Sequence, residues 1–163
     1  MIFLEMLTDG FSSNAKIISI AIKYDNENFE IRNVWDFKNE DDMVLDFISW
    51  FTAQEDKIIA GYNILKFHIP LLLLRAKKFK NFEDFFVKIN KANIIDIFVY
   101  LTFINSGKIN SLDFYCQNYN IGNFVSQQKM DLLIKNSKKE EITKCLIRNL
   151  SCINDLFSRL WGQ

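Results

Sequence analysis

Residues 58–76 constrain the fold more than any other part of this sequence. They begin with a short apolar run, Ile58-Ile59-Ala60, whose length and β-branched content are typical of a buried strand. Gly61-Tyr62-Asn63 then interrupts the apolar pattern, as expected where a strand leaves its sheet. Pro70 suits the first turn of a helix, because the N–H that proline lacks would have no partner there. The following Leu71-Leu72-Leu73-Leu74 is apolar on nearly all sides, which predicts a buried helix.

The connection between this strand and this helix carries the polar groups of interest. His68 is the only histidine of the chain, and Asn63 lies at the start of the same loop. In open α/β sheets, ligands bind in the crevice beyond the carboxyl ends of the strands. We therefore expect Asn63 and His68 to lie at a functional edge of the sheet.

The order of elements along the chain predicts an α/β fold. Strands are expected at residues 1–7, 16–24 and 29–37, with a hairpin loop at 25–28. Helices are expected after a cap at 39–42, within 81–91 and 93–104, after a cap at Ser111, and from a capping box at 137–140 to Trp161. Together with residues 58–60 and a short strand at 93–96, this order predicts a mixed central sheet of about five strands flanked by helices. We expect a single domain spanning residues 1–163.

Composition excludes several classes of protein. No apolar run approaches the length of a membrane span, and the N-terminus lacks the layout of a signal peptide, so no membrane association is expected. Cys116, Cys145 and Cys152 show no metal-site spacing, and we expect them to behave as small apolar residues in a reducing compartment. The predicted location is intracellular, either cytoplasmic or associated with the nucleoid.

Zero net charge conceals an uneven distribution of charge. Residues 1–56 hold 12 acids and 4 bases, whereas residues 57–163 hold 8 acids and 16 bases. The bases bunch in short clusters, among them Arg75, Lys77, Lys78 and Lys80. Such clusters can contact phosphates, but a solvated helix face explains them equally well.

The central stretch also carries a family resemblance. It resembles the second motif of the DEDD-type, or DnaQ-like, 3′–5′ exonucleases, which typically read G-x-N-x-x-x-F-D-x-P-x-L-x-x-R-A. The matching residues are Gly61, Asn63, Phe67, Pro70, Leu72, Arg75 and Ala76. His68 stands where that motif has its catalytic aspartate. The resemblance extends over nearly the whole chain, through FLEMLTDGF, NIIDIFVYL and SCINDLFSRL, and implies the ribonuclease-H-like fold.

The resemblance implies specific positions for a metal site. These exonucleases hold two divalent ions about 4 Å apart through four carboxylates, two of them from a D-x-E pair on the first strand. The aligned residues of the pair are Glu5 and Leu7, and leucine cannot bind a metal. In the last helix, Asp155 stands at the position of the fourth acid, and Ser151 at that of the tyrosine that orients water. The residues at these positions are relics of a metal site, and they predict that the two-metal centre no longer assembles.

The first functional hypothesis is therefore a catalytically degenerate exonuclease-like domain. It would bind single-stranded nucleic acid or act as a scaffolding subunit of a replication, repair or RNA-processing assembly, with a polymerase or other nucleic-acid machinery as its protein partner. The residues implied in nucleic-acid binding are Asn63, Lys66, Arg75, Lys77 and Lys78.

Two alternatives remain open at the level of sequence. One is an active nuclease that holds a single Mn²⁺ or Mg²⁺ ion with Glu5, His68 and Asp155, since two carboxylates and an imidazole form a legitimate ligand set. The other is a small-molecule or nucleotide binder that reuses the cleft. Under the simplest reading, His68 is a hydrogen-bonded structural residue, Asp155 a solvated helix acid, and Glu5 a paired carboxylate at the end of a strand.

Overall fold

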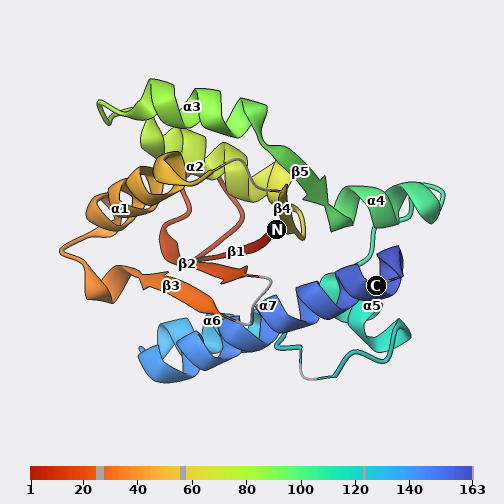
Figure 1. The fold of residues 1–163 in the computed structure, drawn as a ribbon. Helices are drawn as coiled ribbons and strands as arrows, with labels where there is room; N and C mark the ends of the chain where they lie inside the picture. The colour runs from red at the N-terminus through yellow and green to blue at the C-terminus, as the bar shows by residue number, and fades with distance from the viewer. Residues whose placement is uncertain (25–27, 56–57, 123, 163) are drawn as a thin grey trace.

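A five-stranded mixed sheet forms the centre of the molecule (Figure 1). The computed structural model describes residues 1–24, 28–55, 58–122 and 124–162. The strands are β1 (Ile2–Thr8), β2 (Ile17–Tyr24), β3 (Phe29–Asn33), β4 (Ile58–Gly61) and β5 (Asn93–Asp96), arranged in the order β3-β2-β1-β4-β5. The β1–β2 and β2–β3 pairs are antiparallel, and the β1–β4 and β4–β5 pairs are parallel. The predicted mixed sheet is confirmed.

The central strand β1 separates two hydrophobic cores because its side chains alternate between the faces of the sheet. Ile2, Leu4 and Met6 face a core built with α1 (Glu40–Ala53), α2 (Ile69–Ala76) and α3 (Phe82–Lys91). Phe3 and Leu7 face a second core. That core is completed by α4 (Ile97–Ile104), α5 (Leu112–Asn118), α6 (Gln127–Lys135) and α7 (Lys139–Trp161). Helices therefore cover both faces of the sheet.

Local sequence signals explain where several of these helices begin. Asn39 caps α1 by accepting the N–H of Asp42, and Ser111 caps α5 by accepting the N–H of Phe114. Both predicted caps are confirmed. The three cysteines are buried and free, in agreement with their expected role as small apolar residues.

Other details of the sequence prediction were wrong. The third strand ends at Asn33, and Val34–Asp36 forms a 3₁₀ turn instead of extending the strand to residue 37. The predicted capping box is absent, because Ser137 has a left-handed backbone and α7 begins after Lys138 with no side-chain cap. Helix α6 was not predicted. Residues 25–27 of the predicted hairpin loop lie outside the described residues.

The helix after Pro70 is less buried than its four leucines suggest. Leu71 and Leu72 lie in the core, but Leu73 is partly buried and Leu74 is exposed. The reason is geometric, since consecutive residues of a helix point about 100° apart and a helix lying on one face of a sheet buries only one side. The exposed side of α2 instead faces a groove toward α3.

Arg75 holds the connection between β1 and β2 in place. Its guanidinium donates to the carbonyls of Ser13 and Ala15 and forms an ion pair with Glu40 at 3.1 Å. The same Glu40 carboxylate accepts the N–H of Ile17 at the start of β2. Arg75 therefore joins the loop, α1 and α2 through its guanidinium.

None of the helices in the described part of the chain combines the length and the hydrophobicity that crossing a bilayer requires.

Candidate active-site pocket

The side chain of Glu5 lines a pocket on the face of the sheet that carries α7. Because Phe3, Glu5 and Leu7 alternate with core residues of the opposite face, all three point to the α7 side. Glu5 is partly buried, whereas Leu7 is fully buried in the hydrophobic core. The D-x-E positions of the first motif therefore lie where the resemblance implied, but one of them is part of the packing.

The connection from β4 to α2 places His68 at the same pocket. Asn63 has a left-handed backbone with φ of 60°, a conformation that asparagine tolerates better than most residues. Ile64–His68 then forms a π-helical turn that runs directly into α2, where a loop was predicted. His68 is 6% exposed, and its Nδ1 atom has no hydrogen-bond partner.

Asp96 fixes the shape of this connection. Its Oδ1 accepts the N–H of Asn63 at 2.9 Å and that of Phe98 at 3.0 Å, and its Oδ2 accepts the N–H of Leu65 at 2.9 Å. Asp96 therefore caps α4 and clamps the start of the π-helical turn at the same time. Sequence analysis placed Asp96 at the end of a strand but missed this role. The available signal was an acid at the junction between an apolar strand and an apolar helix.

On α7, the residue that faces Glu5 and His68 is Asn149, which is 6% exposed. Each polar atom of its amide bonds to Val125, because Oδ1 accepts the N–H of Val125 at 2.8 Å and Nδ2 donates to the carbonyl of Val125 at 3.0 Å. Sequence analysis did not single out Asn149. The available signal was a polar residue in the apolar stripe of the last helix, between Leu146 and Ile153.

Asp155 does not join this pocket, which corrects the predicted grouping with Glu5 and His68. It is exposed and lines a separate depression with Asn120 and Arg159. Six residues separate it from Asn149, so it points about 120° away around the helix axis. Ser151 is also committed elsewhere, since its hydroxyl donates to the carbonyl of Ile147 at 3.0 Å.

The pocket itself has a volume of about 440 Å³. Besides the groups already described, its lining is mainly aromatic and polar, and it includes the carboxyl group of Asp113. The aromatic residues are Phe11, Tyr62, Phe67 and Phe124, and the polar ones include Asn63, Ser126 and Gln127. The N-terminus of α6 lies at this pocket, and the side chain of Ser126 makes no capping bond there.

The remaining predicted contacts lie away from the pocket. Lys66 and Lys77 line a neighbouring groove, and the ammonium of Lys66 lies 4.9 Å from the ring centroid of Phe98. Lys78 forms an ion pair with Asp41. Of the five residues predicted to bind nucleic acid, the structure therefore places only Asn63 at the pocket that contains Glu5 and His68.

Comparison with known proteins decides the family. The family model for the exonuclease domain of DNA polymerase family B matches residues 6–117, which is more than half of the chain. The chain belongs to the exonuclease-domain family of the family B DNA polymerases. A search of curated proteins found no significant match. The match includes the β4–α2 connection of this exonuclease-domain protein and its Asp96, but it covers neither Glu5 nor α7.

The pocket of this exonuclease-domain protein does not fit the paired divalent ions that such a fold implies. Among the described residues there is no group of three or more histidine, cysteine, aspartate or glutamate side chains able to hold a metal ion. Leu7 offers no donor atom, and both polar atoms of the Asn149 amide are occupied by Val125. Two ions held by oxygen ligands would lack most of their coordination shell here.

Burial shifts the pKa values of two residues that line the pocket, Glu5 and His68. Burial raises the pKa of the Glu5 carboxyl from 4.5 to about 8. Burial also lowers the pKa of His68 from 6.5 to about 4. In the absence of a cation, burial therefore favours the uncharged forms of Glu5 and His68.

Replacing Glu5 with glutamine should stabilise the protein at alkaline pH. The unfolded chain loses the Glu5 proton near pH 4.5, whereas the folded protein retains it until about pH 8, so the stability contributed by this group falls as pH rises through that window. Glu5→Gln removes this loss, and we expect a gain of about 2–4 kcal/mol at pH 8.5 relative to pH 4. Urea unfolding at a series of pH values, without divalent cations, measures it.

The control for this experiment is Glu140→Gln, at an exposed position in the first turn of α7. It should preserve the pH dependence of the wild type. Identical pH profiles for Glu5→Gln and the wild type would contradict the raised pKa of Glu5.

Proposed function

We propose that this exonuclease-domain protein no longer hydrolyses nucleic acid and instead binds single-stranded DNA in the pocket of Glu5, His68 and Asn149. The observation that carries the proposal is the chemistry at these three positions. A glutamate, a buried histidine and an asparagine amide bonded to the backbone stand where a hydrolytic centre needs several anionic oxygen ligands. Without a metal-activated water, this centre lacks its nucleophile.

The lining of the pocket supports a role in binding. Phe11, Phe67 and Phe124 offer ring surfaces on which unpaired bases can stack, and such stacking tolerates any base sequence. Ser126 and the N-terminus of α6 offer hydroxyl and amide donors for a phosphate group. Aromatic walls with hydroxyl and amide donors suit an unstacked terminal nucleotide better than a metal-bound phosphate.

The family supports a setting at a polymerase. Exonuclease domains of this family belong to DNA polymerases, so DNA and a replicative or repair assembly are the natural context. In that context, a domain that binds a DNA end without cutting it would act as a scaffold that holds the strand near its partner. No ion is required for this function.

The direct test is an oligonucleotide assay with two readouts. A 5′-labelled dT16 strand is incubated with the protein in Mg²⁺, in Mn²⁺ and in EDTA, and both fluorescence anisotropy and strand length are followed. We expect no trimming in any buffer and the same affinity with and without EDTA. Phe124→Ala should weaken binding about tenfold, because one stacked base contributes roughly 1–3 kcal/mol.

Phe103→Ala provides the matched control for Phe124→Ala. Phe103 is an exposed phenylalanine of α4 that does not line the pocket, so its removal should leave the affinity unchanged. Trimming of the strand in Mn²⁺ that disappears in EDTA would refute the loss of hydrolysis. Its further loss in Asp155→Ala would favour the active nuclease with a non-standard site. Absence of any dT16 binding would refute the binding role.

A further inference from the structure

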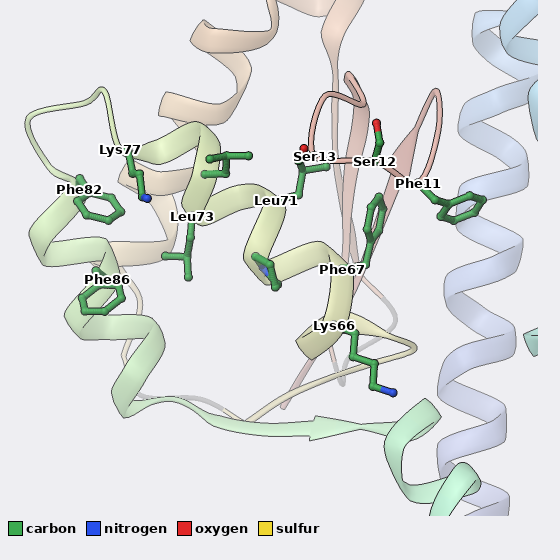
Figure 2. A pocket seen from close by; sticks show the side chains of 12 residues that line it. Phe11, Ser12, Ser13, Lys66, Phe67, Leu71, Leu73, Lys77, Phe82 and Phe86 are labelled. Carbon is green, nitrogen blue, oxygen red and sulfur yellow. The ribbon is translucent and has the colours of Figure 1, made fainter. Parts of the chain in front are cut away.

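A second cavity, a groove beside the pocket, is lined mainly by residues outside the proposed DNA site. It lies between α2, α3 and the β1–β2 loop and has a volume of about 600 Å³ (Figure 2). The groove and the pocket share only Phe11 and Phe67, whose rings pack against each other at 5.5 Å. The groove is therefore a neighbouring but separate surface.

Large apolar side chains stand exposed along this groove. Phe11 is 71% exposed, Leu74 43% and Phe86 44%, and each belongs to a different element. Figure 2 shows Leu73 of α2 directed toward Phe82 and Phe86 of α3 across the groove. Single exposed apolar residues are ordinary on protein surfaces, but several that line one concavity mark an interaction site.

The charges of the groove all have one sign. Among the described residues that line it, Lys66 and Lys77 carry the charge and none is acidic. Figure 2 shows Lys77 beside Phe82 at one end and Lys66 below Phe67 at the other. Lys66 lies in the π-helical turn that precedes α2, and Lys77 directly follows α2, whose eight residues span about 12 Å, or two turns. The groove thus has an apolar floor about two helical turns long with a cation near each end.

These dimensions suit a peptide helix better than a nucleic-acid strand. Phe82 and Phe86, the aromatic residues of the groove that do not also line the pocket, pack against each other, which leaves their ring faces less available to bases. Much of the remaining floor is aliphatic, from leucines of α2. An amphipathic helix places apolar side chains at positions i, i+4 and i+7, and that spacing spans about two turns, the length of the groove.

We propose that this groove is the docking site for an amphipathic helix of a partner protein that carries an apolar face with acidic residues at both ends. The apolar face would cover Phe11, Leu74 and Phe86, and the acidic ends would meet Lys66 and Lys77. This inference goes beyond the proposed DNA binding, because it concerns a different surface and a different class of partner.

A peptide selection tests the proposal. A displayed library of random 16-residue peptides is selected on the intact protein, and the enriched peptides are synthesised with a fluorescein label for anisotropy measurements. We expect apolar residues with i, i+4 and i+7 spacing and acidic residues near both ends. Phe86→Asp and, separately, Leu74→Asp should weaken binding at least tenfold, and Lys77→Glu about threefold or more.

Matched controls lie outside the groove. Leu132→Asp and Lys135→Glu change exposed residues of α6 and should leave peptide affinity unchanged. Thermal unfolding confirms that the variants are folded. Binding of dT16 should be the same in Phe86→Asp and the wild type. The proposal for peptide docking and the proposal for DNA binding are therefore tested independently.

Several results would overturn the proposal. These are a selection that enriches no peptide, enriched peptides that bind Phe86→Asp and Leu74→Asp as tightly as the wild type, and peptides with basic ends. Loss of dT16 binding in Phe86→Asp would identify the groove as a DNA surface instead. A dimer in light scattering that Phe86→Asp dissociates would identify a second copy of the chain as its occupant.

Discussion

Replacement of Asp96 with alanine is expected to destabilise the protein by about 3–5 kcal/mol. The Asp96 carboxylate accepts three backbone N–H groups, from Asn63, Leu65 and Phe98, and all three lose their acceptor at once. A buried donor without a partner costs roughly 1–3 kcal/mol, and the loss of the cap on α4 adds to this. Urea unfolding at pH 7, analysed by linear extrapolation, measures the effect.

A conservative variant sharpens this prediction. In Asp96→Asn, the amide oxygen can retain the two bonds made by Oδ1, and only the N–H of Leu65 faces an amide nitrogen. We therefore expect Asp96→Asn to cost less than half as much as Asp96→Ala. Asp131→Ala is the matched control, because Asp131 is exposed and accepts a hydrogen bond from the side chain of Gln127 on the surface of α6. It should change stability by less than about 0.5 kcal/mol. Equal losses in Asp96→Ala and Asp131→Ala would disprove the role of Asp96 as a clamp.

The second large effect is expected for Gly61→Ala. A Cβ atom at Gly61 would lie 2.6 Å from the carbonyl oxygen of Leu4 and 2.6 Å from Cγ2 of Ile64. The first of these is backbone of the central strand β1 and cannot rotate away, so β4 must shift relative to β1. Such overpacking typically costs 1–3 kcal/mol and occasionally more, and we expect about 3 kcal/mol here. The same unfolding assay measures it.

Gly122→Ala is the control for this substitution. No atom lies within 4 Å of the Cβ position at Gly122, so alanine there should be neutral or slightly stabilising. Because β4 leads into the connection that carries His68, Gly61→Ala should also weaken dT16 binding. If Gly61→Ala unfolds at the same urea concentration as the wild type, the close approach of β4 to β1 is not as described.

These two predictions concern the same piece of architecture. Gly61 lets the end of β4 lie against β1, and Asp96 at the end of β5 holds the turn that follows. The two residues together position His68 above Glu5, on the face that α7 covers. The stability of the β4–α2 connection and the shape of the pocket therefore depend on each other.

Most elements of the fold could be predicted because their signals are local. Alternation and apolar runs predicted the strands, and capping side chains such as Asn39 and Ser111 predicted the starts of α1 and α5. Helix α6 was missed because it is short and largely polar, and its burial rests on Met130 and Leu133 packing against α7. The π-helical turn at residues 64–68 was missed because its backbone is held from a distance by Asp96.

The site could be predicted in part. Glu5, Leu7, His68 and Asn63 lie where the resemblance implied, because motifs attached to strand ends keep their place when the sheet forms. Asp155 was assigned to the pocket on the strength of its neighbours in the sequence, and Asn149 faces the pocket instead. Arg75 matched the family pattern correctly, but its partners Ser13, Ala15 and Glu40 lie far away along the chain.

The sequence alone determined the family of this protein and the order of its strands and most of its helices, because periodicity, caps and motif spacing are properties of neighbouring residues. Only the tertiary structure decided which side of α7 packs on the sheet, which carboxyl groups are buried, and which basic side chains form internal ion pairs. Those outcomes depend on burial and on contacts between residues tens of positions apart. The charge state of Glu5 and the role of Asn149 follow from such contacts.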